Sequence, residues 1–251
     1  AGLGSRHNVR HWGDGAKEAR VSQAALRRYH YYLTADERSG DLMRAVKDAD
    51  YTLLEFDPLR IARPRDRFPT AATARIRVGP DWLAFAGNWM TEWERTGDIR
   101  WREKIIAGVD SILAMPYWLR TGHFNGLNPD LPNGEIGPLR GGGAQLMAID
   151  VDTGRLTPIR DPITKGYIPV SYNLSTIMGG AEVMFELVPL LGREDFAKAW
   201  LQYTRIGNAP AEVLDRDRVT GNEGADASLG LTGQSGPRLA AYSYAKTGNR
   251  A

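Results

Sequence analysis

Histidine, arginine and amide side chains are densest near the beginning of the chain, in a segment that we call the histidine loop (residues 7–15). It contains two of the four histidines of the chain and is closed by two glycines. Its polar and aromatic members are His7, Asn8, Arg10, His11, Trp12 and Asp14. Imidazole and carboxylate groups transfer protons, while arginine and amide groups bind polar or anionic partners. We therefore predict substrate binding or catalysis here, with a structural, hydrogen-bonded loop as the alternative.

The spacing of these histidines does not favour a metal site. His7 and His11 stand four residues apart, which places two ligands on one face only in a helix. Gly13 and Gly15 argue against a helix, because glycine favours irregular backbone. The spacing also lacks the glutamate of the His-Glu-x-x-His motif.

No other pattern in the sequence points to a resident cofactor. The chain has no cysteine, which excludes thiol catalysis, iron–sulfur clusters and cysteine zinc sites. Asp150 and Asp152 leave calcium as an alternative, but the EF-hand spacing is absent and a turn accounts for both aspartates. We therefore predict that the protein needs no cofactor.

Arginines are concentrated in one later connection, where Asp66 is the single acid among them. They are Arg60, Arg63, Arg65, Arg67, Arg75 and Arg77. The planar guanidinium group matches carboxylates and sulfates with two parallel hydrogen bonds. This density predicts an anionic ligand, and the alternatives are a solvated basic loop or a contact with another domain.

A third group of polar residues lies in the longest connection. It comprises His123, Asn125, Tyr172 and Asn173. Tyr172 can act as an acid or base if an arginine lowers its pKa, whereas packing at a helix start is the alternative. Some of the seven tryptophans, Trp12 among them, could stack on sugar rings.

Paired carboxylates for glycoside hydrolysis are a separate alternative. The candidates that lie near the starts of predicted helices are Asp14, Asp81, Glu223 and Asp226.

Four similar short turns indicate the elements that must position these residues. They align on Ala35, Gly97, Gly192 and Gly248. A small residue suits a left-handed helix C-cap, and a following Asp or Asn can cap the next helix. Apolar stripes at helical spacing flank the turns, so we predict three antiparallel helical hairpins plus the first arm of a fourth, which begins at Pro237. One such stripe, formed by Leu42, Val46, Ala49 and Leu53, predicts a single helix.

The connections between these hairpins are long and polar, over residues 56–80, 116–172 and 208–228. In antiparallel hairpins these connections all emerge at one end of the bundle, where long loops commonly form a functional site. The alternative is that the loops only cover the surface. Residues 122–169 form an insertion with a predicted β-hairpin, in which residues 144–149 and 155–159 flank a turn.

Composition excludes several classes of protein. The chain has 251 residues, 42% of them hydrophobic, and a formal net charge of +2. No run approaches the ~20 apolar residues that span a bilayer, and the balanced charge argues against a nucleic-acid binder. Because the chain begins at Ala1 without methionine, we expect it to be part of a longer protein.

Helical hairpins with Thr-Gly-Asp turns and long loops at one end resemble the (α/α) toroid, or six-hairpin, superfamily of carbohydrate enzymes. The run in residues 6–15, followed by Tyr31-Tyr32-Leu33-Thr34 and Arg38-Ser39-Gly40-Asp41-Leu42, resembles more specifically the rhamnogalacturonan exolyases. The expected fold class is therefore all-α: residues 1–251 form a partial toroid of about 3.5 hairpins, with the remaining hairpins and the β-domains outside this chain.

The resemblance implies cleavage of a uronate-containing, rhamnogalacturonan-type polysaccharide by β-elimination. His7 and His11 are then base candidates, Asn8 and Arg10 carboxylate binders, and Tyr172 a candidate acid. Expected partners are an acidic polysaccharide and the other domains of the parent chain, and the resemblance and the lack of cysteine suggest an exported protein. A glycoside hydrolase of the same superfamily and a non-catalytic carbohydrate-binding domain are the alternatives.

Overall fold

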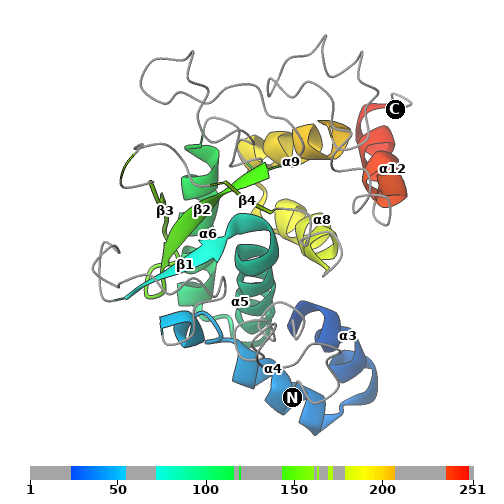
Figure 1. The fold of residues 1–251 in the computed structure, drawn as a ribbon. Helices are drawn as coiled ribbons and strands as arrows, with labels where there is room; N and C mark the ends of the chain where they lie inside the picture. Colours follow the sequence, from blue (N-terminus) through cyan, green and yellow to red (C-terminus); the bar gives the residue numbers. More distant parts are fainter. Residues whose placement is uncertain are drawn as a thin grey trace, which may run out of the picture.

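A computed structural model describes residues 24–54, 72–115, 119, 143–160, 163, 169–171, 179–206 and 236–248. Most of these residues are helical (Figure 1). The helices are α3 (Ala24–Thr34), α4 (Glu37–Val46), α5 (Leu83–Thr96), α6 (Ile99–Leu113), α8 (Gly180–Leu191), α9 (Glu194–Ile206) and α12 (Gly236–Thr247). The strands are β1 (Thr73–Arg77), β2 (Gly143–Asp150), β3 (Leu156–Pro158) and β4 (Pro169–Ser171).

The tight turns have the left-handed backbone that their sequences predict. Ala35, Gly97, Gly192 and Gly248 have φ angles of +54°, +69°, +62° and +69°. The N–H of each donates to the carbonyl four residues earlier, as at Gly97, which bonds to Trp93 at 2.8 Å. Asp36 and Asp98 then cap α4 and α6 by accepting the N–H groups of Ser39 and Arg100. The hairpins α3–α4, α5–α6 and α8–α9 are therefore confirmed.

Helix α5 lies at the centre of the described part of the bundle. Its residues from Leu83 to Glu92 are all buried, and it packs against α3, α4, α6 and α8. The approach of α6 is close, because a Cβ added to Gly108 would lie 2.2 Å from Nε1 of the buried Trp82. Glycine at this position thus permits the packing of the second hairpin.

The predicted β-hairpin is present and belongs to a larger antiparallel sheet. Strand β2 pairs with β1, β3 and β4, with Thr73 opposite Asp150 and Gly143 opposite Ser171. Strand β1 lies within a connection that the sequence predicts to be a loop. Its pattern of short apolar residues alternating with arginines becomes a strand because β2 supplies its hydrogen-bonding partner over five residue pairs.

The single helix predicted from Leu42 to Leu53 is wrong. Helix α4 ends at Val46, and a turn leads into a 3₁₀ segment, Tyr51–Leu54. Ala49 and Leu53 are still buried in the core. The apolar spacing of the sequence therefore continues past Val46, although the helix ends there. The amide of Asn88 on α5 donates to the carbonyl of Val46 at 3.0 Å and holds this helix end.

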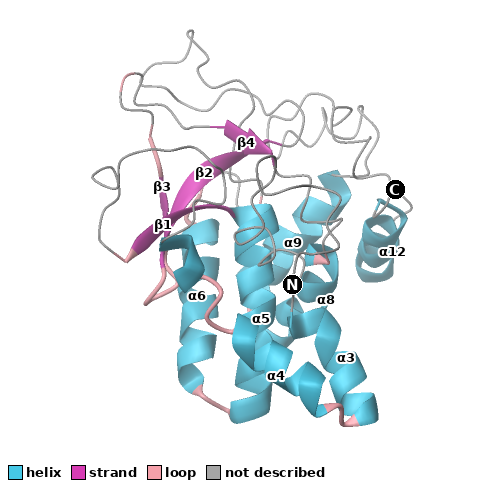
Figure 2. Cartoon of the chain, turned by 60° about the horizontal axis from the view of Figure 1, so that its bottom comes forward, coloured by secondary structure: helices cyan, strands magenta, loops and turns pink. Residues whose placement is uncertain are grey.

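The sheet and the turns of the first two hairpins lie at different ends of the bundle, whereas Arg193 in the turn of the third hairpin pairs with Asp110, next to the contact of α6 with β3. In Figure 2 the turns of the first two hairpins lie at the lower end, while the strands lie beside and above α6. Strand β1 continues through a π-helical turn, Val78–Trp82, directly into the start of α5. Among the described helices, none is both long and apolar enough to cross a membrane.

Candidate functional site

Most of the residues that the sequence selects for the site lie outside the described residues. They are His7, Asn8, Arg10, His11, Trp12, Asp14, Arg60, Arg63, Arg65, Arg67, His123, Asn125, Tyr172, Asn173, Glu223 and Asp226. Their roles stay predictions. The structure shows only the helices and strands that adjoin their segments in the sequence.

The sheet sets where two of these segments start. Tyr172 directly follows Ser171, which pairs with Gly143 at the first residue of β2. The arginine-rich segment enters β1 at Thr73, which pairs with Asp150 at the other end of β2. These two points are separated by the length of the strand, or roughly 20–25 Å at about 3.4 Å per residue. The arginine-rich segment and the segment that follows Ser171 therefore join the sheet at opposite ends of β2.

Two of the six arginines do not lie in a solvated loop. Arg75 is in β1 and only 4% exposed, and burial lowers the pKa of its guanidinium group. The backbone N–H of Arg77 donates to Asp81 Oδ2 at 2.8 Å, and the Arg77 Nε atom lies 3.8 Å from the same oxygen. The alternative of a solvated basic loop is therefore wrong for Arg75 and Arg77, and an anionic ligand for the arginine-rich segment stays a prediction. Asp81 is buried against β1, which argues against its use in a hydrolytic carboxylate pair.

The turn interpretation of Asp150 is confirmed. Its Oδ1 atom accepts the N–H groups of Asp152 at 3.1 Å and Thr153 at 2.9 Å, and the Thr153 hydroxyl at 3.0 Å. This is the hydrogen bonding of an aspartate that closes a turn. Within the ranges that the structure describes, no three His, Cys, Asp or Glu side chains are grouped to hold a metal ion.

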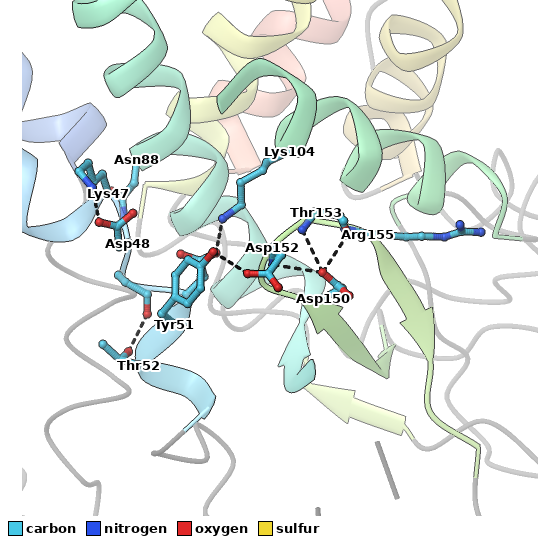
Figure 3. Close-up of polar contacts among 12 residues, drawn as sticks. Lys47, Asp48, Tyr51, Thr52, Asn88, Lys104, Asp150, Asp152, Thr153 and Arg155 are labelled. Atoms are coloured by element: carbon cyan, nitrogen blue, oxygen red, sulfur yellow. Dashed lines mark hydrogen bonds and ion pairs between the residues drawn. The ribbon is translucent and has the colours of Figure 1, made fainter. Parts of the chain in front are cut away.

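The β2–β3 turn joins the helices at a polar cluster that we call the junction cluster: Asp50, Tyr51, Lys104 and Asp152. Figure 3 shows Tyr51, Lys104 and Asp152 pointing toward one another from three different segments. The Tyr51 hydroxyl donates to Asp152 Oδ1 at 2.8 Å, and Lys104 Nζ donates to Asp50 Oδ2 at 2.5 Å. The cluster therefore ties the end of the first hairpin to α6 and to the sheet.

The ion pair of the junction cluster is buried among aromatic rings. Asp50 is 0% exposed and Lys104 is 6% exposed. Lys104 Nζ lies 4.5 Å from the ring centre of Trp89 and 5.2 Å from that of Tyr51. Such contacts stabilise a desolvated cation. Burial raises the pKa of Asp50 to about 6, although the neighbouring ammonium group opposes this shift.

The hairpin turn also contacts α6 through its backbone. A Cβ on Gly154 would lie 2.4 Å from the carbonyl oxygen of Lys104, and Gly154 has a φ of +77°. The N–H of Leu156 donates to the Ser111 hydroxyl at 3.0 Å. Beyond this contact, α6 and β3 border a cavity of about 520 Å³ lined by Ser111, Met115, Arg155 and Pro158, among others. The sheet is therefore fixed along α6.

Sequence analysis missed the junction cluster and Asn88. Asn88 Oδ1 accepts the N–H of Ala24 at 2.8 Å, so this amide holds the start of α3 and the end of α4. The available signal was a polar residue inside an apolar helix, since Asn88 lies between Phe85 and Trp89. For Asp50 and Lys104 the pairing spans 54 residues and has no local signature.

Comparison with known proteins links this architecture to one family. A family model described as "PcRGLX-like protein C-terminal alpha/alpha toroid domain" matches residues 1–251. A segment of the chain is 51% identical over 122 residues to "Uncharacterized protein YetA" of Bacillus subtilis (strain 168). The match covers 49% of this chain and 14% of that protein, so this chain corresponds to a small part of its relative.

Proposed function

Because the chain belongs to the PcRGLX-like C-terminal alpha/alpha toroid family, we propose that it is part of a polysaccharide lyase that cleaves a uronate-containing, rhamnogalacturonan-type polymer. The observation that carries this proposal is the match of a rhamnogalacturonan lyase-like toroid over the whole chain, together with the helical hairpins and sheet. The relative's printed name assigns it no activity, so the reaction is our inference.

The reaction is a β-elimination with three requirements. The uronate carboxylate must be neutralised so that the proton on C5 becomes acidic, for which we propose Asn8 and Arg10. A base, His7 or His11, takes that proton, and the electron pair forms the C4–C5 double bond as the C4–O4 bond breaks. Tyr172 protonates the departing O4. No electron acceptor is needed, because the step is redox-neutral.

The same proposal covers the ligands and the location of the protein. The arginines that lie ahead of β1 in the sequence, Arg63, Arg65 and Arg67, would bind the acidic polymer with Trp12, Asp14, His123, Asn125 and Asn173. The parent chain supplies further domains, and we propose that the protein is exported to meet its polymer. The proposal assigns no cofactor, and dialysis against EDTA followed by addition of calcium tests that point.

The assay is the absorbance of a 4,5-unsaturated uronate after the full-length protein is incubated with rhamnogalacturonan. We expect the chromophore to form and to be lost in His7→Ala or His11→Ala, while Arg44→Ala, an exposed arginine on α4, has no effect. Reducing sugar without the chromophore would instead indicate a glycoside hydrolase. Saturable binding without any product would indicate a non-catalytic binding domain.

A further inference from the structure

A cluster of tyrosines and carboxylates joins three helical hairpins of the described bundle. We call it the Arg28 cluster: Arg28, Tyr29, Tyr32, Glu94 and Glu186. Arg28 lies on α3, Glu94 in the last turn of α5 and Glu186 on α8. The Arg28 Nη1 atom lies 2.6 Å from Glu94 Oε2, and its Nη2 atom pairs with Glu186.

The cluster combines a fixed centre with an accessible rim. The Arg28 side chain is 7% exposed, whereas the side chains of Glu94 and Glu186 are 45% and 37% exposed. One buried guanidinium group therefore orients two carboxylates that still reach solvent. This is the preorganisation that a binding site for a small polar ligand requires.

Two half-exposed tyrosines border these carboxylates. Tyr29 is 50% exposed and Tyr32 is 51% exposed, and as residues three apart on α3 they are neighbours on the helix surface. The Tyr29 hydroxyl donates to Glu186. Burial raises the pKa of Tyr32, and the negative charge of Glu94 adds to this effect. The centre of the Tyr31 ring lies 5.4 Å from that of the Tyr32 ring.

The charge of the cluster selects the kind of ligand. One guanidinium faces two carboxylates, which leaves a local net charge of −1 and disfavours an anion. Carboxylates instead accept hydrogen bonds from hydroxyl groups, and aromatic rings provide flat apolar faces. A sugar ring without a charge presents both hydroxyls and an apolar face of C–H groups.

We propose that the Arg28 cluster is a binding site for a neutral pyranoside of the polysaccharide, separate from the uronate site. This inference rests on the proposed carbohydrate function, which it extends by naming a neutral sugar as a second ligand. Tyr32 supplies the stacking face, and Glu94 and Glu186, held by Arg28, accept hydrogen bonds from the sugar hydroxyls. The alternative is a set of ion pairs that only holds three hairpins together.

The experiment measures binding of methyl α-rhamnopyranoside by saturation-transfer NMR, with galacturonic acid as the charged comparison. We expect the neutral sugar to bind and the uronate to leave this cluster unoccupied. Tyr32→Ala and Glu94→Gln should each weaken neutral-sugar binding at least tenfold. Tyr244→Ala, which removes another half-exposed tyrosine on α12, should leave it unchanged.

Circular dichroism and thermal melting identify any variant that fails to fold. If Glu94→Gln fails to fold, the test depends on Tyr32→Ala alone. Absence of neutral-sugar binding in the unmodified protein, or full binding by folded Tyr32→Ala, would overturn the inference. The chromophore assay on the same proteins separates the two proposals. Neutral-sugar binding without elimination would remove the proposed function only, and elimination without neutral-sugar binding would remove this site only.

Discussion

At the level of single residues, Asp50 and Lys104 form a buried ion pair between two segments of the described fold. Its atoms are 2.5 Å apart and no more than 8% of either side chain is exposed. Removing one member of such a pair leaves an uncompensated buried charge, which costs more than the pair gains relative to apolar side chains. The pair also joins segments that are distant in the sequence.

We expect Lys104→Met to lower the free energy of unfolding by about 3–5 kcal/mol, because Asp50 is left buried without its cation. In the double variant, Asp50→Leu with Lys104→Met, the loss of unfolding free energy should be smaller than the sum of the losses in the two single variants. Arg44→Met is the control, since Arg44 belongs to an exposed pair with Asp41 and should cost no more than about 1 kcal/mol. Urea unfolding of the unmodified protein, Lys104→Met, Asp50→Leu, the double variant and Arg44→Met measures these values, and additive single effects would contradict coupling.

The same pair predicts a dependence of stability on pH. Burial raises the pKa of Asp50 to about 6 from an unfolded value near 3.8, so the folded state binds more protons between these values. Stability contributed by this group is therefore full below about pH 4 and is lost as the pH rises through 6. Relative to Asp50→Asn, the unmodified protein should lose on the order of 3 kcal/mol over this interval, at about 1.4 kcal/mol per pKa unit.

Urea unfolding at several pH values between 4 and 7 measures this difference directly. The comparison with Asp50→Asn cancels the titration of other carboxylates, which both proteins share. In Lys104→Met the difference should extend to higher pH, because the ammonium group that lowers the Asp50 pKa is gone. A difference independent of pH in this range would show that Asp50 is not protonated in the folded state.

At the level of elements, the sequence predicted what depends on the local chain and missed what depends on distant partners. Gly97 and Gly192 mark their turns because only a few residue types adopt left-handed backbone easily. Strand β1 escaped prediction because its pairing with β2 spans more than 70 residues, from Thr73 to Asp150. The sequence also did not predict that α4 ends at Val46, because Ala49 and Leu53 stay buried although they lie in a turn and a 3₁₀ segment.

The turns allow a matched pair of substitutions. Ala35 is the single non-glycine residue with positive φ among the described residues, at +54°. We expect Ala35→Gly to relieve left-handed strain and stabilise the protein by up to about 1 kcal/mol, since the strain of about 1–2 kcal/mol exceeds the entropy cost of glycine.

Gly97→Ala is the reverse change at the corresponding turn, where no atom lies within 4 Å of the added Cβ. Its expected destabilisation of about 1 kcal/mol therefore reports backbone strain without steric clash. Thermal melting of the two variants measures both effects. Changes of the same sign at the two turns would show that their left-handed conformations differ in strain.

At the level of the whole molecule, the sequence predicted the arrangement of helices better than the positions of the candidate site residues. The sequence predicted helical hairpins because turns and helical stripes repeat along the chain, and it predicted the family through the resemblance of residues 6–15 and 31–42 to the rhamnogalacturonan exolyases. It selected site residues by side-chain chemistry alone, and most of those residues lie outside the described part of the chain. Side-chain chemistry alone left Arg75 and Arg77 in a predicted loop, whereas both lie in β1, where Arg75 is buried and Arg77 pairs with Asp81.

The two proposed ligands should differ in their response to salt. Binding of an acidic oligosaccharide through Arg63, Arg65 and Arg67 should weaken as the salt concentration rises, because exposed charges are screened over ~10 Å at 0.1 M. Arg63→Ala should weaken it by about 1.5–3 kcal/mol if the guanidinium group makes a charge-assisted hydrogen bond. Arg44→Ala changes the same charge on α4 and should have no comparable effect.

Binding of methyl α-rhamnopyranoside to the Arg28 cluster should stay constant over the same salt range, because this sugar has no charge to screen. Titrations of both ligands at low and high salt, on the unmodified protein and the two arginine variants, measure the contrast. Salt-insensitive binding of the acidic oligosaccharide, or equal losses in Arg63→Ala and Arg44→Ala, would contradict neutralisation of a polyanion by the arginine-rich segment. The ligand would then have to be held by uncharged groups, and the histidine loop would be the next segment to test, through Asn8→Ala.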